Sequence, residues 1–151
     1  DVLTAFLALD TFVELYDGGT IRLSEFVNRK PDKDILLSVI VRKSKRKFRY
    51  ESIRQTKTDF PVIACSVVTG MVHGKETWYF SVGARPMKAA LLEKQWEIPA
   101  DASEDMIADY ARQAASEFTY GTNMRGSAEY RRHLAEVLIR REMSSILAEG
   151  R

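Results

Sequence analysis

The sequence predicts an α+β protein in which a small antiparallel sheet packs against a helical layer from the C-terminal part of the chain. Apolar runs rich in β-branched and aromatic residues, which are typical of strands, are concentrated between residues 11 and 82. Two long segments with helical periodicity follow, at residues 103–120 and 127–148. The chain has 151 residues, of which 45% are hydrophobic, so it can bury the core of one domain or of two small lobes.

Short elements are expected near the N-terminus. Residues 2–9 form an apolar helix that ends near Asp10. Residues 11–16 and 20–23 form a β-hairpin, because the Asp-Gly-Gly sequence between them supplies glycines for a turn with positive φ. A helical turn comes next, and the polar loop at residues 28–34 is a plausible boundary between lobes.

The middle of the chain contains the strongest strand patterns. Residues 35–41 are continuously apolar apart from one serine, which predicts a strand buried on both faces. Residues 47–54 alternate, and residues 61–72 and 77–82 form an antiparallel pair joined by a turn. Residues 87–95 are predicted to form a short helix.

Two amphipathic helices end the chain. The first begins at Ser103 and is stopped by Gly121, and the second is capped by Ser127. In the second helix, Tyr130 is expected to pack the domain, whereas Arg131 and Arg132 are expected to face solvent or a neighbouring subunit. The predicted apolar stripes are Met106, Ile107, Tyr110, Ala111, Ala114, Ala115 and Phe118, then Tyr130, Leu134, Val137, Leu138, Met143, Ile146 and Leu147.

The residues themselves provide no catalytic constellation. Cys65 lies in an apolar run and is expected to be a buried structural thiol, while His73 and His133 are not at metal-ligand spacing. No apolar run is long enough for a membrane span, and the single cysteine is consistent with a reducing cytoplasm. Because the chain begins at Asp1 without an initiator methionine, we expect a part of a longer chain or a processed one.

Residues 42–54 form the strongest charge cluster, with seven basic residues and one acidic residue. Such a cluster could contact phosphates, with Phe48 and Tyr50 stacking on bases. The favoured interpretation is a solvated turn between two strands, because the rest of the chain adds no second basic face. A nucleic-acid-binding module is therefore the least favoured functional hypothesis.

The last helix also carries a family resemblance. Residues 125–132 (Arg-Gly-Ser-Ala-Glu-Tyr-Arg-Arg), followed by Val-Leu-Ile-Arg-Arg at 137–141, resemble the closing helix of the FAD-binding (medium) subunits of molybdenum hydroxylases of the xanthine dehydrogenase and carbon monoxide dehydrogenase type. Shorter matches occur in the same order along the chain, in the segments 1–15, 22–26, 34–41, 54–63 and 81–89.

The resemblance implies a division of the chain and a set of cofactor contacts. Residues 1–43 correspond to the C-terminal part of the FAD-binding domain, a remnant of its second lobe, and residues 44–151 to the flavoprotein C-terminal domain. Three positions match flavin contacts of the family, namely Asp1, Leu36 and Glu51. Glu51 departs from the family pattern, because a lysine is usual there, and Arg49 lies close by.

The resemblance also implies a function and partners. Subunits of this family pass electrons from iron–sulfur clusters through FAD to NAD or another acceptor, beside a molybdopterin subunit and an iron–sulfur subunit. The two glycine-rich loops that hold the FAD pyrophosphate correspond to sequence upstream of Asp1, so we expect this chain alone to bind FAD weakly or not at all, and to be inactive. The alternative is a non-catalytic scaffold or interaction domain for partner subunits.

Overall fold

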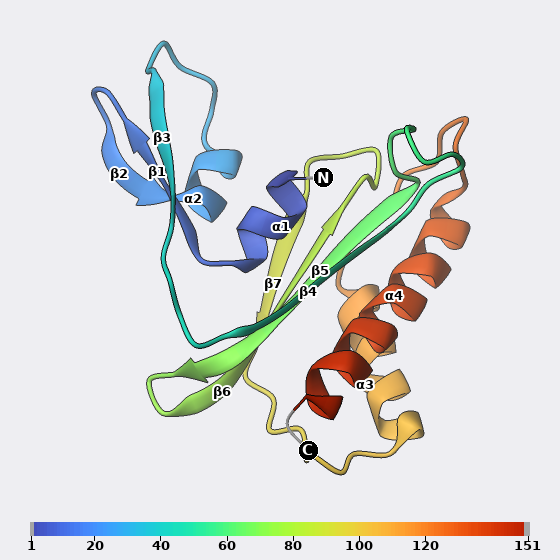
Figure 1. Ribbon diagram of the computed structural model, residues 1–151. Coiled ribbons are helices and arrows are strands. Elements are labelled where there is room, and N and C mark those ends of the chain that lie inside the picture. Colours follow the sequence, from blue (N-terminus) through green and yellow to red (C-terminus); the bar gives the residue numbers. More distant parts are fainter. Residues whose placement is uncertain (1, 150–151) are drawn as a thin grey trace.

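The computed structural model describes residues 2–149, which form two antiparallel sheets and four helices (Figure 1). The fold is therefore α+β, as predicted. The elements in chain order are α1 (Val2–Ala8), β1 (Thr11–Leu15), β2 (Gly19–Arg22), α2 (Leu23–Asn28), β3 (Leu36–Val41), β4 (Lys47–Ile53), β5 (Ile63–Val72), β6 (Lys75–Gly83), β7 (Ala90–Lys94), α3 (Glu104–Ser116) and α4 (Ala128–Ala148).

The smaller sheet, in the N-terminal part of the chain, has the strand order β2-β1-β3. The predicted hairpin is confirmed, since Phe12 pairs with Arg22 and Leu15 with Gly19, and Gly19 takes a φ of 66° at the turn. β1 buries Val13 and Leu15 against a small core that also contains Leu7 of α1 and Leu23 of α2. This small core holds α1 and α2 on one face of the sheet.

The larger sheet has the order β4-β5-β6-β7 and is covered on both faces. On one face, Cys65, Val67 and Phe80 join the main core with α3 and α4. On the other face α1 lies across β5, β6 and β7 (Figure 1), and Thr4 approaches so closely that a Cβ at Gly83 would lie 2.0 Å from its Oγ1. A glycine at position 83 therefore allows the first helix to dock on this sheet.

Helix α4 packs most of the predicted stripe, since Leu138, Met143 and Ile146 are buried, but its inner face also contains residues that were not predicted. Its buried positions include Ala135, Leu138 and Ile139, but also two ionisable residues, Arg131 and Glu142, each 1% exposed. Tyr130, which was expected to pack the domain, is 48% exposed. The prediction that Arg131 faces solvent was wrong because a pattern of apolar residues gives no weight to a buried charge that finds acceptors inside the fold.

Three further local predictions were wrong. Residues 90–94 form strand β7 rather than a helix, because Leu92 packs into the main core while Leu91 contacts the core under α1, so burial on two opposite faces outweighs helix propensity. Helix α3 ends at Ser116, well before Gly121, whose N–H instead donates to the carbonyl of Arg85. Met106, assigned to the apolar stripe of α3, is 40% exposed.

The most unexpected outcome concerns β3. The strand is present as predicted, but its side chains are not buried on either face. Val39 and Val41, on the face shared with Val13, are 44% and 43% exposed, and Ile40 on the opposite face is 38% exposed. Leu36 and Leu37, beside a register shift at the start of the strand, are 46% and 54% exposed.

Within residues 2–149, no helix is long and apolar enough to cross a membrane.

Candidate functional site

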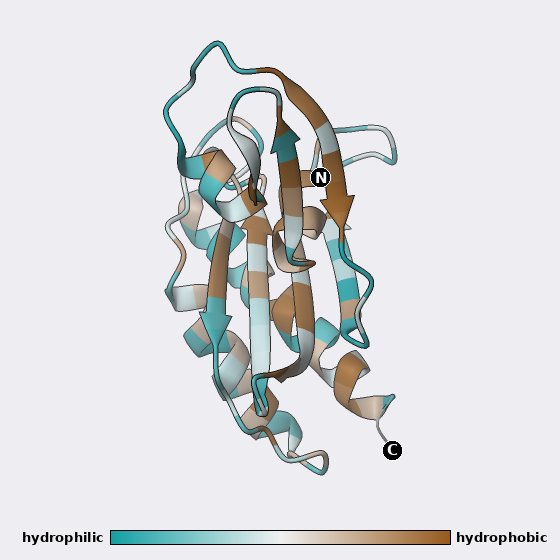
Figure 2. Cartoon of the chain, turned by 90° about the vertical axis from the view of Figure 1, so that its left-hand side faces the viewer, coloured by the Kyte–Doolittle hydropathy of each residue, from teal (hydrophilic) through white to brown (hydrophobic). Residues whose placement is uncertain are grey.

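The exposed apolar strand β3 forms the first part of the candidate site. It is an edge strand, and Figure 2 shows it as a largely brown ribbon on the outer side of the small sheet. Its inner neighbour β1 holds it in register through the pairs Thr11–Val41 and Val13–Val39. A long edge strand with apolar side chains on both faces is a surface on which another strand or layer can pack.

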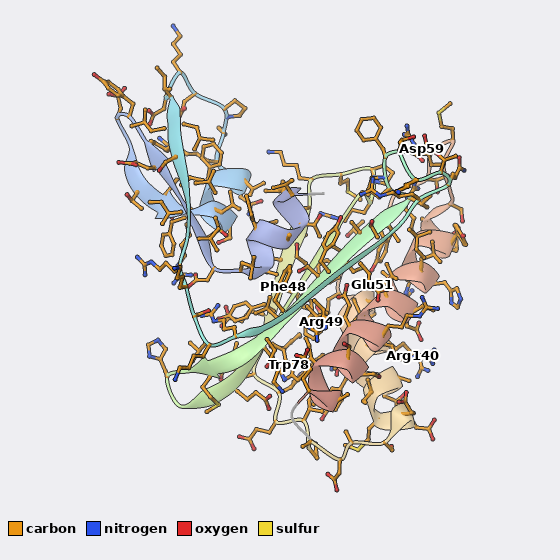
Figure 3. The ribbon with its side chains drawn as sticks, viewed as in Figure 1. Phe48, Arg49, Glu51, Asp59, Trp78 and Arg140 are labelled. Atoms are coloured by element: carbon orange, nitrogen blue, oxygen red, sulfur yellow. The ribbon has the colours of Figure 1, made fainter. Side chains whose placement is uncertain are left out.

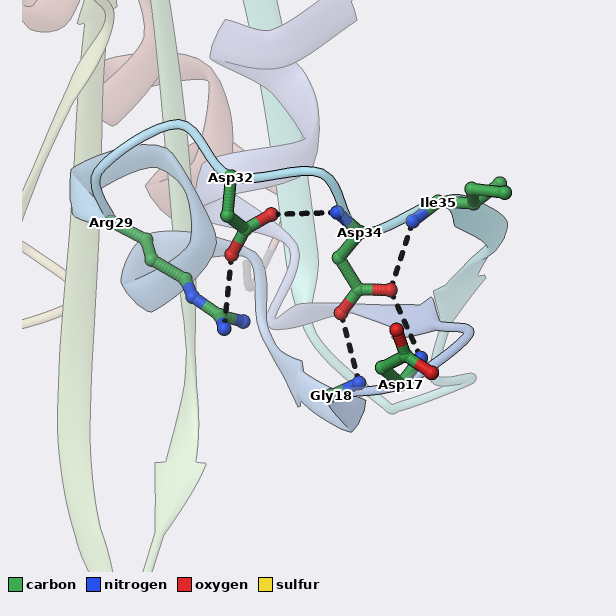
Figure 4. A network of polar contacts seen from close by, with 6 residues as sticks. All are labelled: Asp17, Gly18, Arg29, Asp32, Asp34 and Ile35. Atoms are coloured by element: carbon green, nitrogen blue, oxygen red, sulfur yellow. Dashed lines mark hydrogen bonds and ion pairs between the residues drawn. The ribbon is translucent and has the colours of Figure 1, made fainter.

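Asp34 fixes the start of this strand. Its carboxylate accepts hydrogen bonds from the backbone N–H groups of Asp17, Gly18 and Ile35, at 2.9, 2.9 and 2.8 Å (Figure 4). The bond from the Asp17 N–H group favours the ionised form most and lowers the pKa of Asp34. The β1–β2 turn and the segment entering β3 are thus joined by one side chain, which positions Leu36 two residues later.

A second acidic residue stabilises the same loop. Asp32 accepts a hydrogen bond from the backbone N–H of Asp34 at 3.0 Å and forms an ion pair with Arg29 at 3.0 Å. Next to this loop is a hollow of about 410 Å³ with a mainly apolar lining, whose charged lining residues are Arg29, Lys30, Asp32, Asp34 and Lys88. Lys88 also donates to the carbonyl of Val27 at 2.9 Å, which ties the loop after β6 to α2.

Glu51 lies on the other sheet from Leu36. It is exposed on the edge strand β4, and it shares a face with Arg49, which contacts Ser145 and Glu149 at the end of α4 (Figure 3). Its side chain therefore lies on the side of α4 and not on the side of α1. The structure does not bring Leu36 and Glu51 together on one sheet, and Asp1 lies outside the described residues.

Beneath Glu51 is a buried acidic group. Glu142 of α4 has no hydrogen-bond partner for either carboxylate oxygen within residues 2–149. Desolvation raises the pKa of Glu142 to about 9, so the group is protonated at neutral pH; the nearby backbone N–H of Glu51 opposes this shift, and the charge of Glu51 adds to it. The neighbouring Cys65 is fully buried, and desolvation raises its thiol pKa well above the usual range, which confirms an inert structural thiol.

The comparisons with known proteins agree with this fold. Residues 48–146 match the family model described as the CO dehydrogenase flavoprotein C-terminal domain. The chain belongs to this family. The resemblance read from the last helix is therefore confirmed, and the match covers the larger sheet with α3 and most of α4.

Solved structures show the same fold over almost the whole chain. Quinoline 2-oxidoreductase from Pseudomonas putida 86 matches with a TM-score of 0.78 at 14% identity, covering 99% of this chain and 56% of that chain. The Cu,Mo-CO dehydrogenase in its cyanide-inactivated form matches with a TM-score of 0.74 at 20% identity, covering 98% of this chain. A carbon monoxide dehydrogenase from Hydrogenophaga pseudoflava that lacks the Mo-pyranopterin moiety matches with a TM-score of 0.75 at 15% identity, covering 98% of this chain.

The length of these matches is informative. This chain spans 56% of the length of each of these three solved chains. A search of curated proteins by sequence finds no significant match. The similarity to the solved structures is therefore a similarity of fold.

The basic cluster of this flavoprotein chain is largely engaged in internal contacts. Lys47 donates to the carbonyl of Ile146 and Arg49 bonds to α4, while Arg54 donates to the carbonyl of Asp59. Arg46 forms an ion pair with Asp10 at 3.7 Å and lies over the ring of Tyr79. Several of these basic side chains therefore connect elements of the fold, and the expectation of a simply solvated turn was only partly right.

Neither aromatic residue of the cluster lies on an exposed tip, because Phe48 and Tyr50 are half-buried on β4. Arg42 lies 4.0 Å from the ring centre of Phe12, and Arg22 lies 5.3 Å from the same ring. Within residues 2–149, no cluster of histidine, cysteine and carboxylate side chains could hold a metal ion.

One structural feature next to the candidate sites was missed from the sequence. Arg131 gathers the loop at residues 121–126 and the start of β5 around its guanidinium group. The arginine follows Ser127 by one helical turn, and this spacing within the motif at 125–132 was the available signal. The pattern alone could not show which of the neighbouring arginines points inward.

Proposed function

We propose that this chain is the C-terminal part of the FAD-carrying electron-transfer subunit of a molybdenum hydroxylase complex. The observation that carries the proposal is the exposed strand β3 in a chain of the CO dehydrogenase flavoprotein family. An exposed apolar surface of this kind marks a place where another layer of protein packs. We infer that the polypeptide that carries the glycine-rich FAD loops supplies this cover.

The domain boundary follows from the same proposal. Residues 42–46 connect the small sheet to the large one, and we place the end of the FAD-binding lobe at residue 43 and the C-terminal domain at 44–151. Asp10 of the first part and Arg46 of the second form an ion pair across this connection. The two parts thus present one joint surface to the rest of the subunit.

The proposed cofactor contacts differ in how well they fit. Leu36 has a half-exposed apolar side chain, held in place by Asp34, that can pack against the flat apolar surface of a bound nucleotide. Glu51 is exposed at the free edge of the large sheet on the side of α4, so a flavin contact from this residue requires an approach from that side. Bound FAD would supply the redox chemistry, while these residues would orient and cover it.

The proposed complex includes a molybdopterin subunit and an iron–sulfur subunit, with NAD or another acceptor receiving the electrons, in a reducing cytoplasm. The test is to purify the chain alone and together with the FAD-loop polypeptide. The chain alone should lack a stoichiometric flavin absorbance band, whereas the pair should co-purify as a stoichiometric flavoprotein.

A matched pair of variants sharpens this test. Val39→Asp places a charge on the apolar face of β3 and should abolish co-purification. Met71→Asp changes an equally apolar residue, 67% exposed near the β5–β6 turn, and should leave it unchanged. A flavin band of full intensity on the FAD-loop polypeptide alone, with no gain from this chain, contradicts the proposal.

That contradicting result would support the second candidate function, a non-catalytic scaffold for partner subunits. The specific observation in its favour is the larger sheet with α3 and α4. It encloses its own apolar core, and within residues 2–149 it has no group suited to metal binding.

A further inference from the structure

A second surface lies on the larger sheet, at the end where β5 begins and β6 ends. Three loop segments, at residues 60–61, 84–86 and 123–125, form a hollow of about 280 Å³ together with Arg131. None of these residues belongs to the predicted flavin contacts. The function proposed above therefore does not use this hollow.

The hollow is rigid because Arg131 fixes its walls. Its guanidinium donates to the carbonyls of Val62, Gly121 and Gly126 at 2.9, 2.7 and 2.5 Å. It also donates to the Oδ1 atom of Asn123 at 2.6 Å, and this oxygen accepts the N–H of Arg125 at 2.9 Å. A loop held in this way loses little conformational entropy when a partner binds.

The charge in the hollow is positive. All the acceptors of Arg131 are uncharged oxygens, and within residues 2–149 neither Arg125 nor Arg131 forms a salt bridge. Desolvation lowers the pKa of Arg131, and the nearby charge of Arg125 lowers it further. No residue that lines the hollow is acidic within the described part of the chain. A carboxylate from outside would therefore meet Arg125 directly and would also be attracted by the charge of Arg131, which is buried beneath and 1% exposed.

The rim of the hollow is apolar and exposed. Phe60 is 75% exposed, and the guanidinium of Arg125 lies 5.6 Å from the centre of the Phe60 ring. Aromatic, methionine and arginine side chains are enriched at protein–protein interfaces, and arginine at their energetic hot spots. A free small anion would use the charge and leave this apolar rim uncovered.

We propose that this hollow docks a protein segment that places an aspartate or glutamate carboxylate against Arg125, above the buried Arg131, and lays a neighbouring apolar side chain on Phe60. The segment belongs to a partner chain and not to the FAD-loop polypeptide that covers β3. This proposal does not depend on flavin binding. It can fail while the proposed function holds, and the proposed function can fail while this proposal holds.

The test is an NMR titration of the 151-residue chain with an acetylated hexapeptide of alternating Leu and Glu, compared with the same peptide carrying Gln. The acidic peptide should produce saturable shifts at the side-chain Nε–H signal of Arg125 and at the Phe60 ring. The Gln peptide should bind at least about tenfold more weakly, because it lacks the charge.

Variants locate the effect. Arg125→Gln and Phe60→Ala should each weaken binding of the acidic peptide by about tenfold or more. Arg132→Gln, which removes an exposed arginine of the same helix, should leave the affinity unchanged, and the spectra of all three variants should show the folded chain. Equal binding of the two peptides, equal effects of Arg125→Gln and Arg132→Gln, or no binding would each overturn the proposal. Inorganic phosphate that binds alone as tightly as the acidic peptide would also overturn it, in favour of a small-anion site.

Discussion

Strands β3 and β5 are similar in sequence and opposite in environment. Both are runs of branched apolar residues, yet Ile63 and Val67 of β5 are fully buried while Val39 and Ile40 of β3 are 44% and 38% exposed. β5 lies in the middle of its sheet, between α1 on one face and α3 and α4 on the other. β3 is an edge strand whose faces receive no helix comparable to these. The same apolar pattern thus leads to burial by elements of this chain in β5, whereas in β3 burial would require another polypeptide segment.

A substitution of Arg131 should have the largest effect on stability, because the hydrogen bonds of this residue lie within the chain. Replacing Arg131 with Met would leave several buried carbonyls without donors, and we expect a loss of about 4 kcal/mol in the free energy of unfolding. Urea denaturation would measure it. Arg132→Met is the control, and it should change stability by less than about 0.5 kcal/mol, since this residue is exposed. Similar losses of stability for both variants would mean that the hydrogen bonds of Arg131 do not stabilise the loop at residues 121–126.

The difference in burial between β5 and β3 can be tested by making the same substitution, isoleucine to alanine, in each strand. Ile63→Ala on β5 should cost about 3 kcal/mol, because it leaves a cavity in the main core. Ile40→Ala on β3 should cost less than about 1 kcal/mol in the chain alone. Thermal unfolding would check both values. If Ile40→Ala becomes costly only when the FAD-loop polypeptide is present, β3 is buried at that junction, whereas a large cost in the chain alone would contradict the observed exposure.

Glu142 gives the large sheet a pH dependence. Its pKa of about 9 in the folded chain lies above its ordinary value of 4.5, so the folded state binds the proton more tightly than the unfolded state and stability falls as the pH rises between these values. Between about pH 6 and about pH 7.5, wild type should lose about 2 kcal/mol relative to Glu142→Leu. Parallel stability curves for the two proteins over this range would show that the carboxyl group is not buried in its neutral form.

Asp34 should give the smallest global effect and the most local one. Asp34→Ala removes the acceptor of three backbone N–H groups at the start of β3, so hydrogen exchange at Asp17, Gly18 and Ile35 should speed up. Amides of β5 should be unaffected. Because the pKa of Asp34 is lowered in the fold, the same local loosening should occur in wild type as the pH falls through that value. Faster exchange throughout the chain would assign Asp34 a global role instead.

Much of the local structure could be predicted from the sequence. The hairpin at residues 11–22, the pair β5–β6 and the cap at Ser127 follow from glycine positions, alternation and a side chain that accepts the Tyr130 N–H at 3.1 Å. The segment at residues 90–94 could not be predicted in the same way. Its alanine, leucine and lysine residues favour a helix, and only the layers on either side make a strand the better arrangement.

The candidate site shows the same division. The resemblance placed Leu36 and Glu51 by position along the chain, but the sheet that carries each residue and the side it faces depend on pairing between distant strands. Arg131 was assigned to solvent because arginine usually is, and its burial depends on carbonyl groups far away in sequence, such as that of Val62. Such acceptors have no local signature.

The sequence by itself therefore determined the fold class, the order of most elements and the family, because hydrophobic period, turn residues and a helical motif are local properties of the chain. The tertiary structure decided which apolar strand is buried and which is exposed, which charges lie inside α4, and which arginines line a hollow. Burial is a property of what covers a residue, and the covering groups come from elements that only the fold, or another chain, brings close.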